Sequence, residues 1–263
     1  MKTLCLHGAG TSGDIFSVQT AGLRAKLNTE EHQFDFINAP HSWHAGPGVG
    51  PFFDGPYYAW FEKQTAVDVK GAIEVLLKHM RAQCSPYDTV LCFSQGCNVL
   101  SSLILYHQMD YPGNPLPFRS AIFICGGIPP YVLNTWIAVQ ERARLVAEQN
   151  VRQLRETSAE FADKIEAMMV SGVRQSMWDR PTAIWDGKNR VKSPSWTMPP
   201  LDPADVYGLD LSALSSSLQI NIPTVHVYGH KDPKGGLFTT MEVAMRYHAL
   251  TVSLRTSRVQ YDG

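Results

Sequence analysis

The sequence predicts an α/β domain with a mostly parallel sheet that is covered by helices on both faces. Short apolar runs of strand length alternate along the chain with longer segments whose apolar residues repeat at helical spacing. One of these runs, residues 89–93, stops at a serine among small residues and continues as a helix. At 263 residues the chain is long enough to bury a substantial core. We therefore expect a single domain over residues 1–263.

The expected strands are apolar runs bounded by turn residues. Thr3–Leu6 runs into a glycine-rich loop, and Phe34–Asn38 runs into Ala39-Pro40-His41. Further strands are expected at residues 89–93, 119–125 and 222–228, the last of them in the centre of the sheet.

The expected helices follow from apolar periodicity. Residues 65–83 show the helical repeat, and a second helix continues over 99–106. A segment after the first strand would place Phe16, Leu23 and Leu27 on one side of a helix.

Two segments depart from this alternation. Residues 41–56 are rich in Gly and Pro and predict an irregular loop, which in a compact domain is more often functional than idle. Residues 131–200 are charged at first and then rich in Pro, Trp and Ser, with one or two amphipathic helices expected over 136–176. These residues could form a small separate domain. We favour a lid-like insertion over the carboxyl edge of the sheet, because a strand-like run follows them.

Composition narrows the possible partners. The net charge is −1, the pI is about 6.7 and no basic run occurs, which argues against nucleic acid or an anionic membrane surface as a partner. The odd number of cysteines lacks the paired spacing of a metal site, so we expect no metal and reduced thiols, mostly in the core. No signal sequence or membrane-spanning run is evident, and a cytoplasmic protein is expected.

Ser94 is the first candidate catalytic residue. A buried strand that turns sharply into a helix can hold a serine at the apex with its hydroxyl exposed above the sheet, which is a nucleophile elbow. The G-x-S-x-G spacing survives in part, with Cys92 at the first glycine position and Gly96 at the second. The alternative is an ordinary strand end followed by a serine that caps the helix.

Two other segments fit the same chemistry. Asp232 follows the strand at 222–228, where an acid could orient a catalytic histidine, although an aspartate before proline is also a common turn residue. The loop His7-Gly8-Ala9-Gly10 could form an oxyanion hole, with the backbone N–H groups of Ala9 and Gln95 as donors. His7 could contact substrate, but a histidine beside such a loop more often holds the loop backbone in place.

Motifs along nearly the whole chain resemble those of a known family. They are Leu6-His7-Gly8-Ala9-Gly10 with Ser12-Gly13, Ala39-Pro40-His41, Gly55-Pro56-Tyr57-Tyr58-Ala59-Trp60, Phe93-Ser94-Gln95-Gly96, Phe123-Ile124-Cys125-Gly126-Gly127 and Gly229-His230-Lys231-Asp232-Pro233. In this order they resemble the fungal FSH-type serine hydrolases. The likeness is weakest between about residues 131 and 215.

The resemblance implies an α/β-hydrolase fold and an esterase or thioesterase of secondary metabolism that needs no cofactor. It implies that Ser94 is the nucleophile, Asp232 the acid, and Ala9 and Gln95 the oxyanion-hole donors. Gly8 and Gly10 with His7, and the aromatic residues Tyr57, Tyr58 and Trp60, would line the substrate region, although core packing is equally plausible for the aromatic residues. The partner would be a small or carrier-bound acyl substrate, such as a chain on a polyketide synthase.

The base histidine of this family would lie just beyond Gly263, after the segment Tyr261-Asp262-Gly263. Either the sequence stops short of that residue or the protein lacks the ordinary base. His230 and His41 are possible substitutes, whereas His226 is expected to pack in the core. Besides hydrolysis, two alternatives remain open: a cyclase or acyltransferase with the same fold, or a binding protein without activity.

Overall fold

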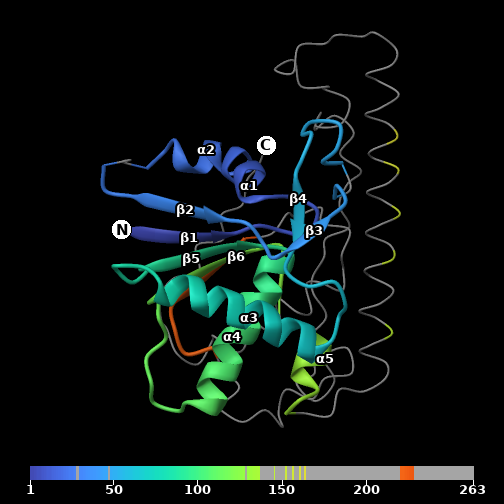
Figure 1. Ribbon diagram of the computed structural model, residues 1–263. Coiled ribbons are helices and arrows are strands. Elements are labelled where there is room, and N and C mark those ends of the chain that lie inside the picture. Colours follow the sequence, from blue (N-terminus) through green and yellow to red (C-terminus); the bar gives the residue numbers. More distant parts are fainter. Residues whose placement is uncertain are drawn as a thin grey trace, which may run out of the picture.

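The computed structural model describes residues 1–27, 30–46, 48–127, 129–136 and 220–227, with Leu145, Arg152, Glu156, Glu160 and Asp163 as single positions (Figure 1). Most of the expected insertion at 131–200 lies outside the described residues. Asp232 and His230 lie outside them as well.

The described strands of the main sheet are all parallel. Their order is β2 (Gln33–Ile37), β1 (Lys2–Leu6), β5 (Thr89–Phe93), β6 (Ser120–Ile124) and β7 (Thr224–Val227). Because parallel strands end at the same edge, the segments after Leu6, Phe93 and Ile124 meet there. The parallel sheet predicted from the sequence is confirmed, and every predicted strand is present to within two residues at each described end.

The apolar run at 222–228 was expected to be a central strand. In the described sheet β7 pairs with β6. The residues after Val227 lie outside the described part of the chain, so the central place of this strand stays a prediction. His226 was expected to pack against other residues, and its half-buried ring stacks on Phe123 with the ring centroids 5.1 Å apart.

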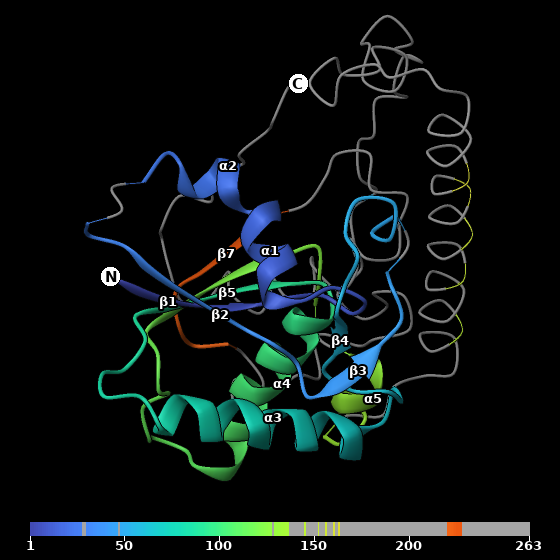
Figure 2. The ribbon, with the colours of Figure 1, turned by 45° about the horizontal axis from the view of Figure 1, so that its top comes forward.

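Helices cover both faces of the sheet (Figures 1 and 2). Helices α1 (Gly13–Gln19) and α2 (Ala21–Arg24) lie on one face, and α3 (Ala66–Arg81), α4 (Gln95–Asp110) and α5 (Pro130–Leu133) lie on the other. Successive residues of β1 point to opposite faces of the sheet and pack in two hydrophobic clusters. Leu4 and Leu6 belong to the cluster on the side of α3 and α4, whereas Cys5 packs with Phe16 on the other side.

The helix starts follow from local capping. Ser12 and Thr65 have extended backbones, and their side chains accept hydrogen bonds from Ile15 N–H and Asp68 N–H at the starts of α1 and α3. Helix α3 confirms the strongest sequence prediction. The prediction for the first helix was wrong in part, because Phe16 is buried but Leu23 and Leu27 are exposed. The expected single helix is interrupted at Thr20, where α1 ends and α2 begins, so the helical repeat of apolar residues does not continue from Phe16 to Leu23 and Leu27.

The segment 41–56 was expected to be irregular, but its first residues form a strand. β3 (His41–Trp43) pairs antiparallel with β4 (Tyr57–Ala59) as a small second sheet. β4 also forms an isolated antiparallel bridge between Tyr58 and Thr11. This second sheet therefore holds the glycine-rich loop after β1.

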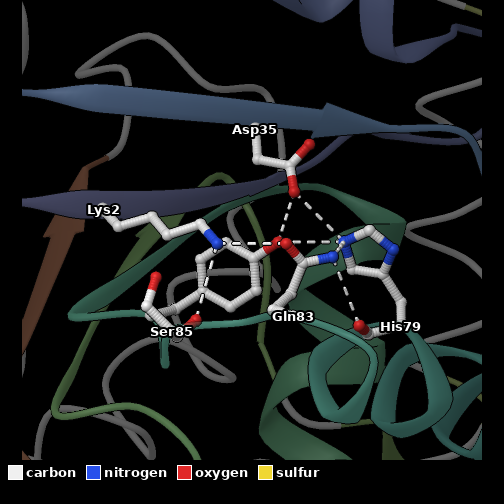
Figure 3. A network of polar contacts seen from close by, with 6 residues as sticks. Lys2, Asp35, His79, Gln83 and Ser85 are labelled. Atoms are coloured by element: carbon white, nitrogen blue, oxygen red, sulfur yellow. Dashed lines mark hydrogen bonds and ion pairs between the residues drawn. The ribbon is translucent and has the colours of Figure 1, made fainter.

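A network of polar side chains joins the strands near their amino ends (Figure 3). Tyr87 Oη donates a hydrogen bond to Asp35, and His79 Nε2 lies 2.9 Å from Tyr87 Oη and 3.1 Å from Asp35 Oδ2. Lys2 Nζ donates to Gln83 at 3.0 Å and lies over the Tyr87 ring. Burial and the Asp35 carboxylate raise the pKa of Tyr87, so the phenol stays a donor. The network ties β1, β2 and α3 together at the edge opposite the candidate active site.

The cysteines in the described residues are free thiols. Cys5, Cys92 and Cys97 are buried, Cys125 is half-buried and Cys84 is exposed. Burial raises the pKa of Cys5 to about 12, which keeps this core thiol protonated and unreactive. None of the described helices has the length and apolar character that crossing a bilayer requires.

Candidate active site

Ser94 occupies the turn between β5 and α4. Its backbone φ of 49° and ψ of −110° lie in a region that favours glycine and that other residues rarely adopt. The turn is held from both sides, because Ser94 N–H donates to Ile124 O and Cys97 N–H donates to Ser94 O, each at 3.0 Å. The Ser94 side chain makes no capping hydrogen bond to α4. The geometry therefore matches a nucleophile elbow and not a side-chain cap.

The glycine-rich loop lies directly against Ser94. A Cβ atom added to Gly8 would lie 3.2 Å from Ser94 Cβ and 2.9 Å from the Phe93 ring. A Cβ atom added to Gly96 would lie 2.6 Å from the carbonyl oxygen of Leu6. The lack of side chains at both glycines thus lets the end of β1 and the start of α4 approach each other beside Ser94.

The backbone N–H groups of Ala9 and Gln95 are the expected oxyanion donors, a role that stays a prediction. Among the described residues, neither N–H has a backbone hydrogen-bond acceptor. Gln95 is the first residue of a 16-residue helix, where unpaired N–H groups and the helix dipole favour negative charge. Ala9 is exposed, between two buried glycines. Gln95 thus follows Ser94 directly at the start of α4, and Ala9 lies in the loop whose Gly8 approaches Ser94.

The side chain of Gln95 has a second role that sequence reasoning missed. Its Oε1 accepts from Trp60 N–H at 2.8 Å, and its Nε2 donates to Phe61 O at 2.9 Å. Trp60 Nε1 in turn donates to His7 O at 2.8 Å. Gln95 and Trp60 therefore connect the start of α4, the segment after β4 and the end of β1.

The aromatic residues expected near substrate differ in burial. Trp60 is fully buried in the main core, so for this residue the packing alternative is the better supported one. Tyr57 and Tyr58 are half-buried, and Tyr57 Oη donates to Phe53 O. Their proposed place beside substrate stays a prediction.

His7 is fully buried, and both ring nitrogens have partners. Nε2 accepts a hydrogen bond from Ala39 N–H at 3.0 Å, which leaves the proton on Nδ1, and Nδ1 donates to Gly8 O at 2.7 Å. Burial lowers the pKa of His7, and the bond to Gly8 O opposes this only in part. The ring is therefore neutral, and the geometry supports its alternative role of holding the loop.

A family model described as Serine hydrolase (FSH1) matches residues 1–247. The chain belongs to this serine hydrolase family. Its parallel sheet, flanking helices and serine elbow form the α/β-hydrolase fold that the sequence predicted.

Curated relatives of this chain include fungal esterases. Esterase FPY3 of Fusarium mangiferae is 33% identical over 132 residues, which cover 49% of this chain and 58% of that protein. The "Dihydromonacolin L-[lovastatin nonaketide synthase] thioesterase" of Aspergillus terreus is 47% identical over 70 residues, which cover 26% of this chain and 27% of that protein. The chain thus spans less than two thirds of either relative, and family membership alone does not assign its substrate.

Among solved structures, the chain is similar to an extracellular alpha/beta-hydrolase from Paenibacillus species. The two are 15% identical, with 93% of this chain and 86% of that chain covered and a TM-score of 0.42.

The structure does not describe the acid or the base expected to act with Ser94. Asp232 and His230 both lie outside the described residues. His41, a possible substitute base, is exposed, and its Nδ1 lies 3.6 Å from Glu62 Oε1. The His226 ring, which was not expected to act as a base, stacks on Phe123.

No metal site accompanies the serine in the described part of the chain, where no group of three or more His, Cys, Asp or Glu side chains could hold an ion. A cavity of about 770 Å³ is lined by Tyr87, His107, Tyr111, Arg119 and Asn221, among others. These residues precede β5, β6 and β7, so the cavity lies at the opposite edge of the sheet from Ser94.

The buried neutral His7 predicts a pH dependence of stability. A depressed pKa means that the folded state binds fewer protons than the unfolded state once the pH falls below about 6.5, the ordinary value for histidine. The stabilisation from neutral His7 is complete above that pH and is lost as the pH falls toward the lowered pKa. We expect the wild-type protein to have a higher free energy of unfolding than His7→Asn at roughly pH 7, and this difference to become smaller at roughly pH 5. Urea unfolding at both pH values measures it. Parallel stability curves would contradict this.

Proposed function

We propose that this member of the serine hydrolase family cleaves an ester or thioester through an acyl-Ser94 intermediate. The observation that carries the proposal is the Ser94 backbone, held at φ 49° between β5 and α4 with the Gly8 loop against it. Few structural needs other than presenting a hydroxyl explain a serine in this conformation.

The chemistry takes two steps. Ser94 Oγ attacks the acyl carbonyl carbon, its proton passes to a base, and the oxygen of the tetrahedral intermediate is held by Ala9 N–H and Gln95 N–H. The bond from carbon to the leaving sulfur or oxygen then breaks, and the leaving group takes the proton. In the second step, water attacks the acyl carbon and gives a proton to the base. The bond from this carbon to Ser94 Oγ breaks, Oγ takes the proton back, and the free acid is released.

We assign the orienting acid to Asp232 and the base to a histidine expected after Gly263. Both assignments rest on the family resemblance, and Asp232 lies outside the described residues. Together with the Ser94 elbow they would complete the order Ser, Asp, His along the chain.

The proposed substrate is an acyl chain carried as a thioester, such as a polyketide on its synthase. The similarity to a thioesterase whose name includes a nonaketide synthase supports this substrate class. The named esterase relative supports hydrolysis over acyl transfer.

Product analysis tests the proposal. We expect the full-length protein to convert a long-chain acyl N-acetylcysteamine thioester to free acid and thiol in equal amounts, as measured by mass spectrometry and a thiol reagent. Release of thiol with a lactone or a transferred acyl ester as product would point to a cyclase or acyltransferase. Binding of the thioester without release of thiol would support the inactive binding protein.

A further inference from the structure

The peptide unit between Gly8 and Ala9 is held from its carbonyl side. Gly8 O accepts two hydrogen bonds, from His7 Nδ1 at 2.7 Å and from Thr11 Oγ1 at 2.8 Å. His7 and Thr11 are 0% and 3% exposed, so both donors are fixed by packing and shielded from water. Two donors on one oxygen determine the direction in which this carbonyl points.

The direction of the carbonyl also determines the direction of the Ala9 N–H. A peptide unit is planar, and in the trans form its C=O and N–H point in opposite directions. Among the described residues, the peptide bond in the cis form is Gly55–Pro56. The Gly8–Ala9 peptide bond is therefore trans. With Gly8 O turned toward buried His7 and Thr11, the Ala9 N–H points away from them, on the exposed side of a loop that contacts Ser94.

The rest of the loop is held by the backbone of neighbouring segments. Gly10 N–H donates to Tyr58 O at 2.9 Å, Tyr58 N–H donates to Thr11 O at 2.7 Å, and Gly46 N–H donates to Gly10 O at 2.8 Å. These bonds fix the loop after Ala9 but do not involve the Gly8–Ala9 peptide. Within the described residues, the orientation of that peptide depends on His7 and Thr11.

We propose that His7 and Thr11 are positioning residues that aim the Ala9 N–H at the oxyanion formed on Ser94. This inference rests on the proposed hydrolase function and deepens it. His7 acts through Gly8 O and not by touching substrate, since both of its ring nitrogens are already engaged. Thr11, which the sequence motifs did not single out, supplies the second donor.

Thr11 offers the more conservative test. Thr11→Val keeps the shape and removes the hydroxyl, whereas Thr11→Ser keeps the hydroxyl. Because loss of an oxyanion donor costs 10²- to 10³-fold and misalignment costs less, we expect kcat for thioester hydrolysis to fall about tenfold in Thr11→Val, with KM changed less than about twofold. Binding of a trifluoromethyl ketone, which forms an oxyanion on serine, should weaken in parallel. Thr11→Ser should restore most of both.

His7 offers a matched pair of amide variants. The amide nitrogen of His7→Asn can replace Nδ1 as donor to Gly8 O, and the amide oxygen of His7→Gln can replace Nε2 as acceptor from Ala39 N–H. If the bond to Gly8 O aims the donor, kcat falls further in His7→Gln than in His7→Asn, by about tenfold. Urea unfolding of both variants separates this effect from loss of folded protein.

The outcomes distinguish the two proposals. Equal kcat in Thr11→Val and Thr11→Ser, or a loss that follows the folded fraction alone, would overturn the positioning role while the parent protein remains a hydrolase. A rise in KM at constant kcat would also overturn it, because an oxyanion donor acts in the transition state. If the parent protein itself does not acylate Ser94, the proposed function fails and the positioning role fails with it.

Discussion

Replacement of Ser94 by alanine is expected to lower kcat for ester or thioester hydrolysis by at least about 10⁴-fold, because the step that forms the acyl-enzyme disappears. The free energy of unfolding should change by less than about 0.5 kcal/mol, since the Ser94 side chain makes no capping bond and alanine keeps the same backbone restraint. Steady-state kinetics on a chromogenic ester and urea unfolding measure the two effects.

Ser94→Gly is the matched variant. It should be equally inactive but more stable than the parent by about 1 kcal/mol, because glycine adopts a φ of 49° without the strain that a side chain brings. A variant at Ser94 that keeps turnover, or a Ser94→Gly protein less stable than Ser94→Ala, would contradict the interpretation of this turn as a strained catalytic elbow.

Gly96→Ala is expected to lower stability by about 1–3 kcal/mol and to reduce activity as well. The added methyl group would lie 2.6 Å from Leu6 O and 2.9 Å from His7 O, which are backbone atoms that cannot rotate away. Helix α4 must therefore move off the end of β1, and the Gln95 N–H moves with it. Circular dichroism during urea unfolding and the kcat of the folded protein would report the two losses.

Gly71→Ala is the control for this substitution. Gly71 lies in the middle of α3, and an added Cβ there meets no atom within 4 Å. Because glycine inside a helix costs roughly 0.5–1 kcal/mol relative to alanine, this variant should be more stable by about that amount with unchanged activity. Similar destabilisation of both variants would show that close approach at Gly96 is not the cause.

Much of the fold was predictable because single segments carry their own signals. The strands at β1, β5 and β6 are apolar runs with clear ends, and the repeat of α3 identifies its buried face. The Ser94 elbow and the Gly8 loop were also predictable, since each needs small residues at fixed places beside a strand end. The residue types within each of these segments were enough to predict its structure.

The errors came from features that depend on distant contacts. The pairing of β3 with β4 was not expected, because residues 41–56 show a composition of turns and no strand pattern. The exposure of Leu23 and Leu27 follows from the break at Thr20, which periodicity alone did not reveal.

The same limit applies to the candidate site. Ala9 and Gln95 were expected as backbone donors, but the bond from Thr11 to Gly8 O and the amide bridge from Gln95 to Trp60 join residues whose side chains have no catalytic signature. Such supporting contacts become visible only when the strand ends are brought together. His7 shows the difference most clearly, since its motif suggests substrate while its hydrogen bonds serve the loop.

Mapping of the covalent adduct of a fluorophosphonate probe tests the central claim most directly. Treatment of the full-length protein, followed by digestion and mass spectrometry, is expected to give one adduct on the peptide that contains Ser94 and none in Ser94→Ala. Hydrolysis by a protein whose Ser94 stays unmodified, or an adduct on another residue with Ser94 intact, would contradict the account.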